Sequence, residues 1–206
     1  MRVFRLSSET HILGIVKGLV SESEKVDKYL KNFQPEVVGI GISSEELDGL
    51  REYIKKGFEL PALSTIEDIY AEKLSVFGDV GYPPPAFESV VAYCTEHKIP
   101  IRPLDLPEVE FTELYCNAVH TRDIIFQSLR IKRLRKKKFE AKEPEDFEIA
   151  WDWHVNKVGG FKRVESARER YMARELKKLN GKVLAIIEIA RAEGVARLLK
   201  ENDRKE

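Results

Sequence analysis

The sequence contains very little cysteine. Of its 206 residues only Cys94 and Cys116 are cysteines, which is too few for a disulfide framework and lacks the spacing of a metal site. We expect two buried or half-buried thiols in a reducing cytoplasm. A disulfide between them is the alternative if the source is a hyperthermophile, because such organisms do form intracellular disulfides.

Long apolar runs and an excess of charge of one sign are also absent. No run approaches the roughly 18 apolar residues of a membrane-spanning helix, and residues 1–9 are charged too early for a signal peptide. Lys and Arg together number 35, as do Asp and Glu, so no net charge favours nucleic acid or an anionic membrane. We therefore expect a cytoplasmic protein with no membrane partner.

Charged side chains are nevertheless dense. They make up 34% of the sequence, against about 25% in average proteins, and balanced charge of this density is typical of thermophilic proteins with surface ion-pair networks. Hydrophobic residues account for 43%, which is enough for a sizeable core. The length fits one large domain, or one domain with a helical addition.

Strand and helix patterns alternate along much of the chain. Apolar runs predict buried strands over residues 3–6, 11–16, 37–42 and 182–189. Prolines interrupt residues 99–104, so that run predicts an edge strand. Helices are predicted after Ser21 and Ser43, which offer N-cap chemistry, and over residues 65–77 and 84–97. This alternation predicts an α/β fold with a mainly parallel central sheet and flanking helices.

A long helical stretch precedes the last predicted strand. It is divided by a loop centred on Gly159-Gly160, ends at Asn180-Gly181, and is followed after the strand by a closing helix over residues 193–202. We therefore expect the first part of an α/β core in residues 1–106, a helical insertion or subdomain in residues 107–180, and the last strand and closing helix of the core in residues 181–206.

Polar residues follow the predicted strands. The carboxyl ends of parallel strands meet at one edge of a sheet, where ligands collect, so these side chains are expected to converge there. They form either a polar pocket beside helix N-termini, which favours anions, or a set of charges that pair with one another. The residues concerned are Lys17, Ser43, Asp105, Glu188 and Arg191.

Two other patterns have alternative explanations. Residues 130–138 hold seven basic side chains, which could follow nucleic acid phosphates. They lack the interleaved aromatics of single-strand binders, and the acidic residues over 140–148 are expected to neutralise them. Trp151 and Trp153 lie two residues apart, so we expect one to be packed and the other partly exposed. The four histidines lack metal-ligand spacing.

Five stretches carry a further pattern, in order along the chain. They are HILGIVK at 11–17, PEVVGIGI at 35–42, IPIRPLD at 99–105, RERYMA at 168–173 and EIARAEGV at 188–195. Together they resemble the motifs of the TraB/PrgY-like family, relatives of the Tiki-type membrane metalloproteases. The resemblance covers most of the chain and implies that the family's fold is retained.

The chain departs from that family at the positions that carry its chemistry. Lys17 and Arg191 stand where the family's two Gly-x-x-His motifs place histidine, and Gly41 stands where its second strand places glutamate. Lys and Arg are normally protonated and repel a divalent metal. The resemblance therefore implies loss of metal-assisted hydrolysis, with Asp105 and Arg168 retained.

The leading hypothesis is a catalytically degenerate TraB-like protein without metal or cofactor. It would bind a small anionic ligand or a protein partner at the strand ends, with the anion held by Lys17 and Arg191 and helped by Arg168. One alternative is a metal-dependent hydrolase of peptidase or esterase type that uses His11, Asp105 and Glu188. A second alternative is a nucleic-acid-binding module through residues 130–138. Self-association into a homo-oligomer stays open.

Overall fold

A five-stranded sheet forms the centre of the protein. The computed structural model describes residues 1–57 and 62–202, except for the side chains of residues 132 and 202. The sheet order is β1-β2-β5-β3-β4, with β1 antiparallel to β2 and the other neighbours parallel. The strands are β1 (Arg2–Arg5), β2 (Thr10–Ile15), β3 (Val37–Ile40), β4 (Ile101–Pro103) and β5 (Val183–Glu188). The predicted α/β class is confirmed, and β4 lies at the edge as its prolines indicated.

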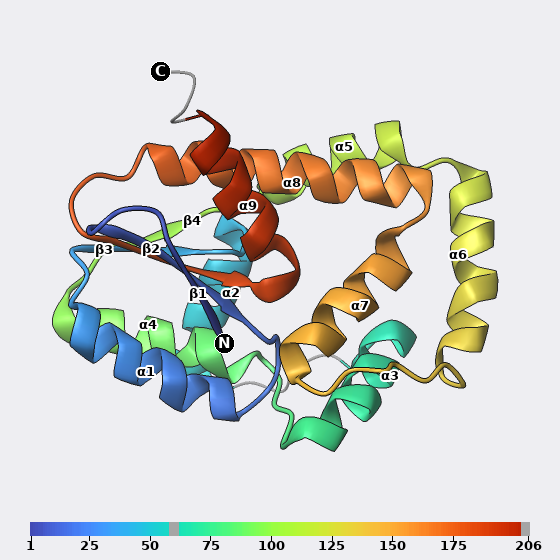
Figure 1. The fold of residues 1–206 in the computed structure, drawn as a ribbon, viewed down its shortest axis with the longest axis horizontal. Coiled ribbons are helices and arrows are strands. Elements are labelled where there is room, and N and C mark those ends of the chain that lie inside the picture. Colours follow the sequence, from blue (N-terminus) through green and yellow to red (C-terminus); the bar gives the residue numbers. More distant parts are fainter. Residues whose placement is uncertain (58–61, 203–206) are drawn as a thin grey trace.

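Helices cover both faces of the sheet because side chains of the central strand alternate between two cores. Leu184 and Ile186 of β5 pack into one core, with α1 (Ser21–Phe33), α2 (Ser44–Lys56) and α4 (Pro85–His97). Val183, Ala185 and Ile187 pack into the other, with α8 (Gly159–Lys177) and α9 (Ile189–Asn202). Figure 1 shows α1 and α4 on one side of the sheet and α8 and α9 on the opposite side.

A helix-rich segment lies between β4 and β5 in sequence, as predicted. It comprises α5 (Glu108–Ala118), α6 (Thr121–Leu134), α7 (Pro144–Asn156) and α8. Helix α3 (Thr65–Leu74) and the 3-10 helix η1 (Ser75–Phe77) fill the predicted helical range 65–77. Side chains of α3 and α7 share a third core with Ile189, so the segment packs directly beside the strand ends (Figure 1).

The two predicted caps have different outcomes. The Ser43 hydroxyl accepts a hydrogen bond from the Glu46 amide at 3.1 Å, and the Glu46 carboxylate accepts one from the Ser43 amide at 2.8 Å. This capping box is as predicted. The predicted cap at Ser21 is wrong, because the N-cap is Val20 and it makes no side-chain cap bond. The amides of Glu22 and Ser23 already donate to Leu19 and Val20, so Ser21 lies inside the helical turn.

Three predicted boundaries in the second half also differ from the structure. Helix α9 begins at Ile189, directly after β5, rather than at Glu193, so no polar turn separates strand from helix and Arg191 lies in the first turn. Gly159 and Gly160 are not a loop but the first residues of α8. Helix α8 ends at Lys177, ahead of the predicted stop at Asn180-Gly181, where Gly181 instead takes the positive φ of the turn into β5.

Gly160 is required by a close backbone approach rather than by a loop. A Cβ atom there would lie 2.7 Å from the Ala118 carbonyl oxygen and 2.9 Å from the Val119 Cα. We expect Gly160→Ala to lower the free energy of unfolding by about 1–3 kcal/mol through overpacking, measured by urea denaturation. Gly49→Ala in α2 is the control, because its Cβ meets nothing within 4 Å and should stabilise by about 0.5–1 kcal/mol. Equal effects of the two substitutions would contradict this explanation.

Both cysteines are free. Cys94 is buried in α4, and burial raises the pKa of its thiol to about 12. Cys116 is exposed on α5, so the expectation of two buried or half-buried thiols is wrong for this residue. None of the helices described is long and apolar enough to cross a membrane.

Candidate functional site

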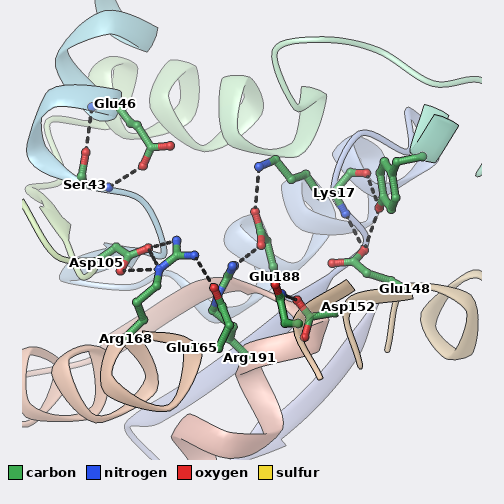
Figure 2. Close-up of polar contacts among 12 residues, drawn as sticks. Lys17, Ser43, Glu46, Asp105, Glu148, Asp152, Glu165, Arg168, Glu188 and Arg191 are labelled. Atoms are coloured by element: carbon green, nitrogen blue, oxygen red, sulfur yellow. Dashed lines mark hydrogen bonds and ion pairs between the residues drawn. The ribbon is translucent and has the colours of Figure 1, made fainter. Parts of the chain in front are cut away.

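Glu188 is the meeting point of the strand ends. It is the last residue of β5 and lies in register with Ile15, the last residue of β2. Its Oε1 lies 3.1 Å from Lys17 Nζ, and its Oε2 accepts a hydrogen bond from Arg191 Nη1. The parallel pairing of β2 and β5 therefore brings Lys17 and Arg191 to one shared carboxylate (Figure 2).

The ion pairs continue from Arg191 into helix α8 and to the end of β4. Arg191 Nε donates to Glu165 Oε2 at 2.6 Å, and Arg168 Nη1 donates to Glu165 Oε1 at 3.0 Å. Arg168 Nε also donates to both carboxylate oxygens of Asp105, at 3.2 and 3.1 Å. We call these residues the ion-pair network; its members, alternating in sign, are Lys17, Glu188, Arg191, Glu165, Arg168 and Asp105.

Charges in the network hold one another ionised against burial. The side chains of Glu188 and Arg191 are only 11% and 10% exposed. Burial opposes ionisation of Glu188, but the positive charges of Lys17 and Arg191 outweigh it and hold its pKa well below the ordinary range. Burial likewise opposes the charge of Arg191, while Glu188 and Glu165 raise its pKa. Three cations face three carboxylates, so the network has no net charge.

Five of the six predicted site residues therefore come together, and Ser43 does not. The contacts of Ser43 are those of the α2 capping box, and Figure 2 draws it apart from the network. The predicted hydrolase set is also not assembled. His11 lies at the start of β2, where its Nδ1 is 2.8 Å from the Tyr29 hydroxyl. It is in register with Leu184, four residues before Glu188, or roughly 13 Å along the strand.

An open cleft lies beside the Lys17 end of the network. Its volume is about 190 Å³, and α3, α7 and the turn after β2 line it. The apolar part of the wall includes Ile66, Val80 and the rings of Tyr70 and Trp151, whose centroids are 5.4 Å apart. The polar part consists of Lys17 and four carboxyl groups, those of Glu67, Glu148, Asp152 and Glu188. We call this space the Lys17 cleft.

Glu148 is the most deeply buried carboxyl group of the cleft wall. Its Oε2 accepts a hydrogen bond from the Lys17 amide at 2.8 Å and lies 3.2 Å from the Tyr70 hydroxyl, which donates to the Lys17 carbonyl at 2.9 Å. Burial, reinforced by the negative charge of Glu188, raises the pKa of Glu148 to about 8. At neutral pH this side chain is therefore mostly a neutral acid, even though it lies beside a lysine.

Asp152 lies one helical turn after Glu148 on α7. Burial raises its pKa to about 6, although the positive charge of Arg191 acts in the opposite direction. Its Oδ1 accepts a hydrogen bond from Asn156 at 2.9 Å. Near pH 7 the cleft thus presents a protonated Glu148, a mostly ionised Asp152 and an ionised Glu188.

A second cavity of about 250 Å³ is also lined by Lys17. It shares Lys17, Tyr82 and Pro84 with the Lys17 cleft, and its remaining wall is largely apolar, with Leu50 and Phe87 among its residues. The loop that precedes α4 therefore forms part of both cavities.

The basic run over residues 130–138 does not form one cationic helix face. Helix α6 ends at Leu134, and Arg130, inside it, donates to the backbone carbonyl of His154. Arg135 pairs with Asp68 at 2.8 Å and with Glu72 at 3.6 Å. At Arg135 the neutralising charges therefore come from α3, and not from the acidic residues after the run as expected.

The tryptophan prediction is confirmed. Trp151 is buried against α3, whereas Trp153 is 64% exposed.

Within the described ranges there is no group of three or more His, Cys, Asp or Glu side chains that could hold a metal ion. Lys17 and Arg191 are both committed to Glu188, so the residues present do not fit a metal at these positions.

Sequence reasoning missed Glu165, Glu148, Asp152 and Tyr70. The spacing of Glu165 and Arg168, three residues apart on a helix, was the available signal for the first of them.

Compared with models of known protein families, the chain matches none, and a search of curated proteins likewise finds no match.

Proposed function

We propose that the protein binds a small molecule in the Lys17 cleft and that this ligand carries an amino group on an apolar or aromatic body. The observation that carries the proposal is the excess of carboxyl groups over cationic groups in the cleft wall. Among the residues that the structure describes, four carboxyl groups and a single ammonium group line the cleft, and that ammonium, of Lys17, already pairs with Glu188.

The pairing of the cations weighs against the anionic ligand expected from the sequence. Lys17, Arg168 and Arg191 each contact at least one carboxylate within the ion-pair network. An anion would have to displace one of these carboxylates, leaving a buried negative charge with fewer partners. Anion binding at these three residues stays a prediction that the contacts do not favour.

The walls suit a protonated amine in two further respects. The rings of Tyr70 and Trp151 supply the electron-rich faces that attract ammonium groups. Glu148 accepts from the Lys17 amide and the Tyr70 hydroxyl through Oε2, so Oε1 is the oxygen that a ligand would contact. An ammonium group beside Glu148 favours its ionised form, so binding near pH 7 should release a proton.

We also propose that the chain is a divergent relative of the TraB/PrgY-like family that has lost metal-dependent hydrolysis. The five matching stretches support this proposal, together with the cationic Lys17 and Arg191 at the two positions where that family places histidine. The free thiols of Cys94 and Cys116 support a cytoplasmic location.

Isothermal titration tests the amine proposal with phenethylamine, tryptamine and agmatine as probes. Their matched carboxylates, such as 3-phenylpropionate, and inorganic phosphate serve as comparison ligands. We expect saturable binding of at least one amine at pH 7. Proton release on binding should appear as a difference in the measured binding enthalpy between buffers of different ionisation enthalpy. We expect Asp152→Asn to weaken that binding by about tenfold, or about 1.4 kcal/mol, because it removes a charge from the cleft wall.

Asp146→Asn is the matched control, because Asp146 lies on the same helix but pairs with Arg2 at the surface. It should leave the affinity unchanged. Binding of phosphate or a carboxylate that Lys17→Ala abolishes would instead support the anion hypothesis, and binding of no amine would refute the proposal. Stoichiometric zinc or manganese in protein purified without chelator, with esterase or peptidase turnover, would support the hydrolase alternative.

A further inference from the structure

Helix α6 presents an apolar face to solvent. Ile125, Phe126 and Leu129 are 55%, 58% and 53% exposed. Arg122 and Arg133 are also exposed, and helical spacing places them on the same side as Phe126 and Leu129. We call these five residues the α6 outer face. It spans twelve residues, or roughly 17 Å of helix from the first to the last.

The inward side of the same helix is more polar than its outer face. Asp123 is buried, and its carboxylate accepts a hydrogen bond from the His120 amide at 3.1 Å. Arg130 reaches inward to the His154 carbonyl, and Leu134 is buried in the core shared with α3 and α7. The helix is therefore held by polar contacts and by apolar contacts of Ile131 and Leu134 near its end, while the side chains of Ile125, Phe126 and Leu129 are left outward. Figure 1 shows α6 at the far end of the molecule from the sheet.

We propose that the α6 outer face docks an amphipathic helix of a partner protein that carries acidic residues beside its apolar stripe. The apolar centre matches the spacing by which helices anchor on one another, and Arg122 and Arg133 lie at its two ends. Acidic side chains on the partner, one near each end, would complete the charge pairing.

The positions of the charges also favour a partner helix over three other possible occupants of the α6 outer face: a second copy of this chain, a membrane and nucleic acid. A second copy packed antiparallel would bring Arg122 of one chain near Arg133 of the other, and like charges there oppose association. Helices that lie on membranes carry Lys and Arg on the face opposite their apolar side chains, whereas here Arg122 and Arg133 belong to the apolar face itself. Nucleic acid is bound mainly through its phosphates, which offer no apolar partner for Ile125, Phe126 and Leu129.

Fluorescence anisotropy tests the proposal with a synthetic cross-linked helical peptide. The probe carries leucines at positions i, i+3, i+4 and i+7 with glutamates at both ends, and is about 20 residues long so that it stays helical. We expect saturable binding that weakens with added salt. Phe126→Ser and the charge reversal Arg122→Glu/Arg133→Glu should each weaken it at least tenfold.

Val109→Ser is the matched control, because Val109 is 69% exposed on α5 and lies outside the α6 outer face. It should leave binding unchanged, and the same peptide with lysines in place of glutamates should not bind. The proposal is overturned if the acidic peptide does not bind or if Phe126→Ser has no effect. It is equally overturned if Phe126→Ser abolishes self-association in sedimentation, or binding to anionic vesicles or duplex DNA, in place of peptide binding.

Discussion

Glu188→Gln is expected to lower the free energy of unfolding by about 3–5 kcal/mol, as when one partner of a buried ion pair is removed. The substitution keeps the size of the side chain and removes the charge that Lys17 and Arg191 share. Arg191 carries most of the effect, since its side chain is 10% exposed whereas that of Lys17 is 42% exposed and partly screened by solvent. Urea denaturation at pH 7, followed by circular dichroism, measures the change.

Two further variants show whether burial of the ion pair causes the loss of stability in Glu188→Gln. Glu52→Gln removes a charge from a surface pair with Lys56, whose side chain is 61% exposed, and should change stability by about 0.5 kcal/mol or less. The double variant Glu188→Gln/Arg191→Met should recover part of the loss, because it removes a buried cation that has lost one of its two carboxylates. Glu165 keeps its ion pair with Arg168 in that variant. A Glu188→Gln protein within about 1 kcal/mol of the original would contradict the role given to the network.

Parallel pairing explains why part of this network could be predicted from sequence. Lys17 follows one apolar run, and Glu188 lies at the end of another. Parallel strands bring such positions to the same edge of the sheet. The choice between an open pocket and paired charges could not be made, because it depends on side chains from a different element. Glu165 supplies the missing negative charge from α8, between Arg191 and Arg168. Within the network, the charged side chains pair with one another and do not line an open pocket.

The mistaken boundaries have two different physical causes. Ser21 and Gly159-Gly160 have the local chemistry of a cap and of a loop, respectively. At Ser21, backbone hydrogen bonds from Glu22 and Ser23 begin the helix earlier. At Gly160, the chain between α5 and α6 comes so close that only glycine fits. At Ser21 the deciding contacts are thus backbone hydrogen bonds within the same turn, whereas at Gly160 they come from a distant part of the chain.

The Lys17 cleft has no local signature in the sequence. Glu148 contacts the Tyr70 hydroxyl and the Lys17 amide, which are 78 and 131 positions away along the chain. The four-residue spacing of Glu148 and Asp152 is ordinary for a solvated helix. What distinguishes these two carboxyl groups is their burial beside Glu188, and that arises only when α7 packs against the end of β5.

That burial predicts an unusual dependence of stability on pH. The pKa of Glu148 is about 8 in the folded protein, against 4.5 for an ordinary glutamate. Between these values the folded state binds more protons than the unfolded chain, so stability falls as pH rises. His154, whose pKa is lowered by burial to about 4, gives the opposite trend below its ordinary value of 6.5. The effect of Glu148 is therefore clearest between about pH 6.5 and pH 8.

In that window the protein is expected to lose about 2 kcal/mol of stability, since each pKa unit corresponds to about 1.4 kcal/mol. Glu148→Gln should be nearly independent of pH there, because its amide resembles the neutral acid and can still accept from the Lys17 amide and Tyr70. Asp146→Asn, on the exposed side of the same helix, should keep the original slope. Urea denaturation at both ends of the window decides the matter: equal slopes for the original protein and Glu148→Gln would show that Glu148 is already ionised at neutral pH.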